Sequence, residues 1–179
     1  MDDELKKTAE EQEEQMIYDA FRKLLDTYLA SNHRKKVDII TRAFNFAKQA
    51  HKGVRRLSGE PYIMHPIAVA QIVCEEIGLG STSICAALLH DVVEDTDTTL
   101  DDLAKIFPKE VTDAIALMTH DDSVPYLEYV KTIKSNPIAS KVKLADLKHN
   151  SDLTRLDTVD DKALERVEKY KKAINILTC

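Results

Sequence analysis

Three separate segments of the sequence carry side chains that could bind one metal ion together. His65 follows a loop that contains Gly and Pro, His90 and Asp91 are adjacent in the run LLHDVVED, and Asp146 lies in KLADLKHN. Imidazole nitrogens combined with carboxylate oxygens suit Mn, Fe or Zn, and a set that contains carboxylates but no thiolate favours Mn or Fe. None of the cysteines has the spacing of a zinc site.

The pair His90-Asp91 stands out because of its surroundings. A His-Asp dipeptide taken alone is more often a surface or hydrogen-bonded pair than a metal site. Here the pair lies inside the most hydrophobic segment of the chain, where a buried carboxylate is costly unless it is paired or bound to a metal. The apolar setting therefore favours metal binding over the surface alternative, whereas His33, His51, His120 and His149 have no such setting and are expected to be solvent-facing or structural.

Two further carboxylates follow this pair. Glu94 comes four residues after His90 and three after Asp91, so on a helix all three share one face. A carboxylate in that position could take a proton from water or deliver one to a leaving group. Asp95 could share this task or orient Glu94, although capping of the next helix is an alternative for Asp95.

Arginine side chains precede the loop SGEPY. A guanidinium group on a loop is well suited to holding phosphate oxygens, and Arg55 and Arg56 offer two of them. They belong to a basic segment, because residues 33–56 contain eight Lys or Arg and one Asp, whereas residues 89–102 contain six acidic residues and no basic one. The two segments could hold an anionic ligand between cations and a metal, or they could both be solvated helix faces.

These side chains must be positioned by helices. The 179 residues include only four glycines and five prolines, and 31% of them are charged, which favours an all-α fold over a sandwich or barrel of short strands. Apolar spacing and Pro or Gly punctuation predict about nine helices and no strand. The predicted helices lie at 4–30, 34–52, 66–77, 82–95 with Ser81 as cap, after Thr98 or Thr99, after Pro108, after Pro125, from Pro137 to 150, and at 160–177.

The overall composition limits the class of protein. The length predicts a single domain over residues 1–179, with the acidic helix 1–30 packed on it or flanking it. No apolar run reaches 18 residues and the polar start MDDELKKTAEEQEEQ does not resemble a signal peptide, so a cytoplasmic protein without a membrane partner is expected. The three cysteines predict reduced thiols, two buried and one at the end of the chain. Outside the acidic start the charge is nearly balanced, which does not indicate a nucleic-acid-binding protein.

The assembled motifs are more specific than any one of them. RRLSGEPYIMHP, AALLHDVVEDTDTT and VKLADLKHN occur in this order. They resemble the hydrolase domain of the stringent-response family, the alarmone synthetase/hydrolases that degrade (p)ppGpp, within the wider HD superfamily of metal phosphohydrolases. The resemblance covers about residues 35–156. It implies an HD-type helical bundle, one Mn²⁺ ion, and removal of the 3′-pyrophosphate from (p)ppGpp to give GDP or GTP and pyrophosphate.

The resemblance also implies roles for single residues. It makes four residues the metal ligands: His65, His90, Asp91 and Asp146. It makes Glu94 and Asp95 the catalytic acidic pair.

For the substrate, the resemblance implies three contacts. Arg56 matches an arginine near the phosphates, Ser58 falls in the loop that meets the guanine, and Asn150 falls where the family contacts the nucleotide sugar.

The chain departs from the long family members in its pocket segments. Leu57 stands where they have a basic residue, and the segments ALMTHDDSVPY and SDLTRL also differ from theirs. The sequence has no room for a synthetase half, so it is similar to the small stand-alone alarmone hydrolases. Two other readings are open: an HD-type phosphohydrolase acting on another nucleotide, and a non-catalytic nucleotide-sensing module, which the intact acidic pairs argue against.

Overall fold

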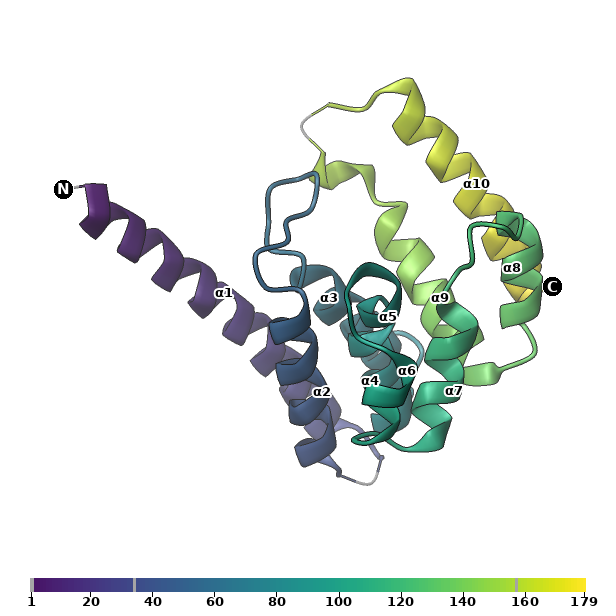
Figure 1. Cartoon of the computed structure of the whole chain (residues 1–179), viewed down its shortest axis with the longest axis horizontal. Coiled ribbons are helices and arrows are strands. Elements are labelled where there is room, and N and C mark those ends of the chain that lie inside the picture. Colours follow the sequence, from purple (N-terminus) through teal and green to yellow (C-terminus); the bar gives the residue numbers. More distant parts are fainter. Residues whose placement is uncertain (1, 34, 157) are drawn as a thin grey trace.

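The predicted all-α architecture is confirmed in the computed structural model, which describes residues 2–33, 35–156 and 158–179 (Figure 1). These residues contain no strand, only one isolated β-bridge between Arg55 and Pro61. The helices are α1 (Asp2–Ala30), α2 (Val37–Ala50), α3 (Met64–Glu75), α4 (Ser81–Leu89), α5 (Val92–Asp95), α6 (Leu100–Ala104), α7 (Lys109–Met118), α8 (Tyr126–Ile133), α9 (Pro137–Asn150), the 3₁₀ turn η1 (Leu153–Arg155) and α10 (Asp161–Thr178).

Helix α4 lies at the centre of the structure. It packs against α2, α3, α7 and α9, and every side chain from Ser83 to Leu89 is buried. This is the most hydrophobic segment of the sequence, and burying it on all sides is what a helix without a polar face requires. Its central position brings the end of α4, where His90 follows, into the interior.

Two details of the segment around α4 differ from the sequence-based expectation. The helix predicted over 82–95 is wrong as a continuous element, because α4 ends at Leu89 and the single turn α5 starts at Val92. The interruption falls on His90 and Asp91, where the His90 ring nitrogen Nδ1 contacts the carbonyl oxygen of Ala87 at 2.6 Å. The predicted Ser81 cap is also wrong: Gly80 occupies the N-cap position and Ser81 is the first helical residue.

Most other helix starts follow their predicted signals. Thr99 rather than Thr98 caps α6, in a reciprocal capping box with Asp102, and Asn136 caps α9 with Pro137 as its first residue. Pro66 does not open α3, which starts two residues earlier, so that His65 lies in the first turn of the helix. The predicted start at residue 34 lies outside the described residues, and α2 begins at Val37.

Helix α1 packs on the remaining helices through its second half, while its first half extends away from them (Figure 1). Phe21 stacks on Phe44 with ring centroids 3.9 Å apart, and Leu24 and Tyr28 are fully buried. Met16 is 39% exposed, whereas the adjacent Ile17 is buried. Further along the projecting part, Glu13 pairs with Arg55 and Glu14 with Lys48, so α1 also contacts the loop before α3.

The remaining sequence-based expectations concern thiols and membranes. Cys74 and Cys85 are buried and Cys179 is exposed, and all three are free, as predicted. Burial raises the pKa of the Cys85 thiol to about 12. Among the described helices, none combines the length and apolar character that crossing a membrane would require.

Of the two alternatives expected for His51, solvent-facing or structural, the structure has a buried position at the C-terminal end of α2. Its side chain is 3% exposed, and its Nε2 atom has no hydrogen-bond partner. Burial lowers its pKa to about 4; the nearby Asp91 carboxylate acts in the opposite direction, and His90 and His65 add to the lowering. The folded protein therefore holds this imidazole neutral at pH values where the unfolded chain protonates it.

This burial makes stability depend on pH. Because the folded pKa lies below the unfolded value of 6.5, the contribution of a neutral His51 is fully present above pH 6.5 and is lost as the pH falls towards 4. We expect the free energy of unfolding of the metal-free parent, relative to a His51→Gln variant, to decrease by roughly 3 kcal/mol between pH 7 and pH 4. Urea unfolding of both proteins at several pH values measures this difference, and two parallel pH profiles would contradict it.

Candidate active site

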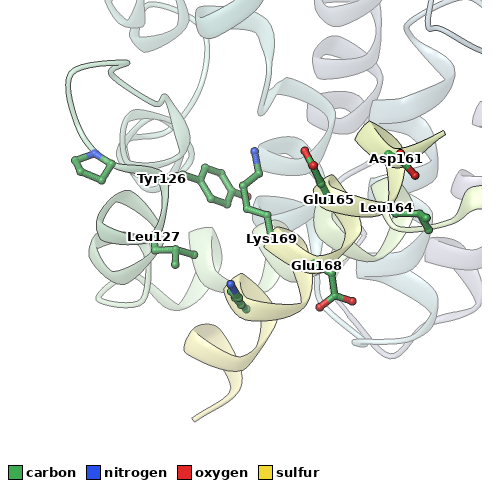
Figure 2. A pocket seen from close by; sticks show the side chains of 9 residues that line it. Tyr126, Leu127, Asp161, Leu164, Glu165, Glu168 and Lys169 are labelled. Carbon is green, nitrogen blue, oxygen red and sulfur yellow. The ribbon is translucent and has the colours of Figure 1, made fainter.

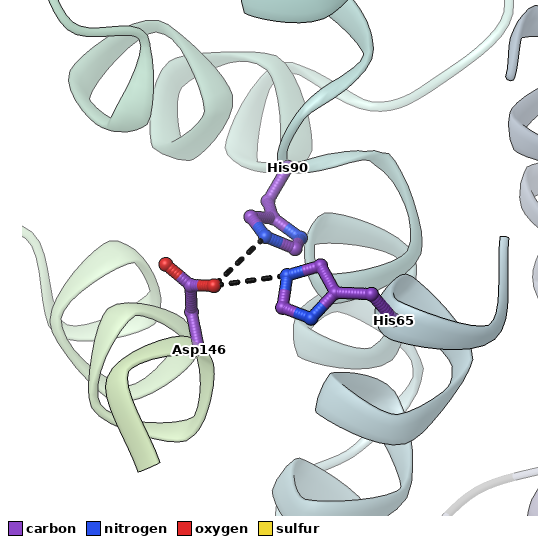
Figure 3. A group of neighbouring side chains, drawn as sticks. All are labelled: His65, His90 and Asp146. Carbon is purple, nitrogen blue, oxygen red and sulfur yellow. Dashed lines mark ion pairs between the residues drawn. The ribbon is translucent and has the colours of Figure 1, made fainter. Parts of the chain in front are cut away.

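Three helices bring the sequence-predicted metal-binding residues to one buried point. His65 comes from the first turn of α3, His90 from the end of α4, and Asp146 from α9 (Figure 3). Their donor atoms lie within 4.8 Å of one another, and all three side chains are buried. Asp146 Oδ1 lies 3.0 Å from Nε2 of His65 and 3.4 Å from Nε2 of His90.

Asp91 adds a second carboxylate to this group. Its Oδ2 atom lies 3.0 Å from Nε2 of His90 and 3.5 Å from Nε2 of His65. Two carboxylate oxygens and two ring nitrogens therefore face the same small volume. The structure thus brings together all four residues that the sequence singled out.

The orientation of the His90 ring favours a metal ion at this point. A carbonyl oxygen can only accept, so Nδ1–H of His90 donates to Ala87 O. In a neutral ring the lone pair then lies on Nε2, which is buried without a hydrogen-bond partner and next to both carboxylates. Lone pairs that face one another repel unless a cation or a proton lies between them. This donor set therefore fits a divalent cation with nitrogen and oxygen ligands.

The same arrangement controls the pKa values of the group. Burial acts to lower the pKa of His90, but the Asp91 and Asp146 carboxylates outweigh it and raise this pKa well above its usual value. Burial acts to raise the pKa of Asp146, but Lys143 and the two histidines hold it well below its usual range. Likewise His90 outweighs burial and lowers the pKa of Asp91. Without an ion, a proton and the Lys143 ammonium group offset the two carboxylates, and metal binding would displace the proton.

Side chains around this centre orient the candidate ligands. His149 Nδ1 lies 2.8 Å from Nδ1 of His65, Lys143 Nζ donates to Asp146 Oδ2 at 2.8 Å, and Tyr62 Oη donates to Asp91 Oδ2 at 2.6 Å. Burial raises the pKa of Tyr62, and the Asp91 carboxylate raises it further. Sequence reasoning missed these three residues. The available signal was helical spacing, since Lys143 and His149 each lie three residues from Asp146.

The predicted catalytic pair lies at the edge of this centre. Glu94 Oε1 accepts a hydrogen bond from the His120 backbone N–H at 3.2 Å, and Asp95 Oδ2 lies 3.3 Å from Tyr62 Oη. Both side chains reach solvent. Partial burial raises the pKa of both carboxyl groups, and the charge of Asp91 raises them further. Raised pKa values suit groups that exchange protons near neutral pH.

The three predicted substrate-binding residues line one pocket of about 330 Å³ beside the centre. Arg56 donates to Asn150 Oδ1 at 3.0 Å, and Asn150 in turn donates to Asp146 Oδ1 at 2.9 Å. Ser58 lies on the loop side of this pocket, next to Leu57, whose side chain is 86% exposed.

The pocket has further lining residues that sequence reasoning missed. Tyr62 belongs to its wall, so the pocket adjoins the metal-binding group, and Arg166 and Tyr170 close it from α10. Nothing in the sequence alone brings α10 to this side, because that contact depends on how the last helix folds back along α8 and α9.

A larger hollow of about 820 Å³ lies elsewhere, between α8 and α10 (Figure 2). Lys169 lies over the Tyr126 ring there, with its ammonium nitrogen 4.6 Å from the ring centroid. None of the residues predicted for catalysis, metal binding or substrate binding lines it. The smaller pocket beside Arg56 is therefore the one connected with the candidate chemistry.

Comparisons with known proteins agree with this geometry. The HD domain family model matches residues 43–172. The human guanosine-3′,5′-bis(diphosphate) 3′-pyrophosphohydrolase MESH1 is 41% identical over 137 residues, which cover 72% of this chain and 76% of that protein. The bifunctional (p)ppGpp synthase/hydrolase SpoT of Escherichia coli K12 is 32% identical over 145 residues, which cover 75% of this chain.

The bacterial relatives are much longer than this chain, because the matched region spans 20% of SpoT. A solved structure described as a metazoan ortholog of SpoT that hydrolyzes ppGpp superposes with a TM-score of 0.68 at 28% identity, and the match covers 81% of this chain and 88% of the other. A family model that matches most of the chain, together with a relative of similar extent, defines the family. This chain belongs to the HD domain family.

Proposed function

We propose that this protein is a metal-dependent phosphohydrolase that removes the 3′-pyrophosphate from (p)ppGpp, giving GDP or GTP and pyrophosphate. The observation that carries the proposal is the buried convergence of His65, His90, Asp91 and Asp146 next to a pocket lined by Arg56. The similarity to human MESH1, whose name describes this activity, supports the choice of substrate.

The proposed cofactor is one Mn²⁺ ion held by His65, His90, Asp91 and Asp146. Two nitrogens and two carboxylate oxygens without a thiolate suit Mn²⁺. The side chains that contact these candidate ligands are those of His149, Lys143, Asn150 and Tyr62. When bound, such a cation lowers the pKa of water and withdraws electron density from phosphate oxygens.

The proposed substrate contacts lie on the loop before α3 and at the end of α9. The Arg56 guanidinium can form paired hydrogen bonds with phosphate oxygens, and it already lies at hydrogen-bond distance from Asn150. Because Asn150 also donates to Asp146, a phosphate held by Arg56 is positioned relative to the metal-binding group. Ser58, in the same pocket, is the proposed contact to the guanine.

The proposed proton carriers are Glu94 and Asp95. Hydrolysis removes a proton from water as it attacks phosphorus and returns a proton to the 3′-oxygen as it leaves. Partial burial and the nearby charge of Asp91 raise the pKa values of both carboxyl groups, which favours their protonated forms compared with exposed carboxyl groups. Their hydrogen bonds to His120 N–H and Tyr62 Oη fix where those protons are exchanged.

The decisive experiment is product analysis. The purified chain, stripped with a chelator and reloaded with Mn²⁺, is incubated with ppGpp and pppGpp, and released pyrophosphate and GDP or GTP are measured. Other nucleotides, including nucleoside monophosphates and dinucleotide phosphates, are tested at the same concentration. Release of pyrophosphate from ppGpp in preference to these supports the proposal. Turnover of another nucleotide only, or no turnover with any metal, would overturn it.

The candidate ligands make a first prediction. We expect His65→Ala and Asp91→Ala to remain folded but to lose the metal and nearly all activity, because each removes one of the four converging donors. Elemental analysis after dialysis measures occupancy, and circular dichroism checks the fold. Full occupancy in both variants would refute the ligand assignment.

Glu94 makes a second prediction. We expect Glu94→Gln to retain Mn²⁺ and nucleotide binding while turnover falls by a factor of about 10² or more, because Gln keeps the shape and the contact to His120 N–H but cannot carry a proton. Calorimetry measures binding and pyrophosphate release measures turnover. Glu128→Gln, on the exposed face of α8, is the matched control and should match the parent. Parent-like turnover in Glu94→Gln would move the proton-transfer role elsewhere, and loss of the metal would make Glu94 part of the metal site.

A further inference from the structure

Tyr62 connects the loop before α3 with the carboxylates of Asp91 and Asp95. It is the last residue of the loop RRLSGEPY and lies one turn before His65 in the chain. Its hydroxyl donates to Asp91 at 2.6 Å and lies 3.3 Å from the carboxylate of Asp95. We propose that Tyr62 is a positioning residue that holds Asp91 in its metal-binding orientation and fixes Asp95 relative to it.

Tyr62 contacts the Asp91 oxygen that is the candidate metal ligand. Oδ2 of Asp91 accepts the hydrogen bond and also faces Nε2 of His90 at 3.0 Å and Nε2 of His65 at 3.5 Å. An aspartate side chain has two freely rotating torsions, and fixing them before binding lowers the entropy cost of coordinating an ion. A hydrogen bond to the ligating oxygen itself selects one orientation of the carboxylate.

The two candidate carboxylate ligands differ in how they are held. Asp146 receives donors from Lys143 and Asn150. Within the described part of the chain, Tyr62 is the one side chain other than the imidazoles that donates to Asp91. Asp91 itself lies between α4 and α5 as the N-cap residue of α5, with its backbone still in the right-handed helical region. Its orientation therefore depends on Tyr62 more than that of Asp146 depends on either of its partners.

Tyr62 is itself fixed from several sides. Its backbone N–H donates to Val54 O at 2.8 Å, and its carbonyl oxygen accepts from His65 N–H at 3.0 Å. Its ring lies against the His51 and His65 rings, with centroids 4.8 Å and 5.8 Å away. These contacts use the backbone and the ring face, so replacing Tyr62 with Phe removes the hydroxyl and leaves the packing in place.

The second half of the proposal concerns Asp95. One phenol hydroxyl lies between two carboxylates: it donates to Asp91 Oδ2 at 2.6 Å, and Asp95 Oδ2 lies 3.3 Å from the same oxygen. In this arrangement one hydroxyl sets the distance between a candidate ligand and a candidate proton carrier. This role rests on the proposed function, whereas the effect on metal affinity does not depend on the substrate.

The test compares Tyr62→Phe with Tyr28→Phe. Tyr28 is also a buried tyrosine, and its hydroxyl accepts a hydrogen bond from the Lys36 backbone N–H far from the metal group. Mn²⁺ affinity of the chelator-stripped proteins is measured by calorimetry, together with thermal unfolding without metal. We expect Tyr62→Phe to bind Mn²⁺ at least about 10-fold more weakly, and Tyr28→Phe to bind it like the parent while unfolding at a lower temperature.

A double-mutant cycle tests the connection to Asp95. Turnover of ppGpp at saturating Mn²⁺ is measured for Tyr62→Phe, Asp95→Asn and the double variant. If Tyr62 acts through Asp95, the double variant is no slower than Asp95→Asn within about 3-fold. Independent effects that multiply would overturn this half of the proposal.

The outcomes separate the inference from the proposed function. Equal Mn²⁺ affinity of Tyr62→Phe and the parent overturns the role of Tyr62, whatever the substrate is. If the parent chain hydrolyses no ppGpp, the proposed function is overturned. If Tyr62→Phe still binds Mn²⁺ more weakly than that parent, the role of Tyr62 at Asp91 is supported.

Discussion

Two carboxylates and two imidazoles meet at one buried point, and the surrounding side chains offset the cost of burying the two negative charges. Uncompensated burial of two negative charges would cost far more than the net stability of a domain. Lys143, itself largely buried, supplies one compensating charge directly to Asp146. His90 supplies another when protonated, and an ion would replace that proton. The remaining polar contacts, from Tyr62, Asn150 and His149, each engage a candidate ligand from outside.

The arrangement of the helices brings these four side chains together. The apolar helix α4, enclosed by α2, α3, α7 and α9, ends in the interior, where His90 follows it. Asp91 is the next residue, and its Oδ2 atom lies 3.0 Å from Nε2 of His90. The early start of α3 has a similar effect, since it places His65 in regular helix geometry opposite Asp146.

Much of this arrangement was predictable from the sequence, and the exceptions share a physical cause. Prolines, glycines and capping residues mark helix ends locally, so the order of the helices and the central place of the LLHDVVED segment follow from the chain itself. Acidic residues in an apolar run identify His90 and Asp91 in the same way. Tyr62, His149 and Lys143 were not found, because a tyrosine, a histidine and a lysine are ordinary surface residues until tertiary packing turns them towards a buried carboxylate or ring. For His51 the sequence left a solvent-facing and a structural position open, and the folded structure decides for a buried one.

The chain of hydrogen bonds from Arg56 through Asn150 to Asp146 has a consequence for how ligands bind. The Arg56 guanidinium has further N–H groups for a phosphate beside the one that donates to Asn150, and Asn150 donates in turn to the Asp146 oxygen that faces both imidazoles. With a nucleotide in the pocket and an ion at the four candidate ligands, as proposed, this chain of hydrogen bonds would link the two occupancies thermodynamically. By reciprocity, whatever factor the ion applies to the affinity for the nucleotide, the nucleotide applies to the affinity for the ion. Scarcity of either one then changes how firmly the protein retains the other.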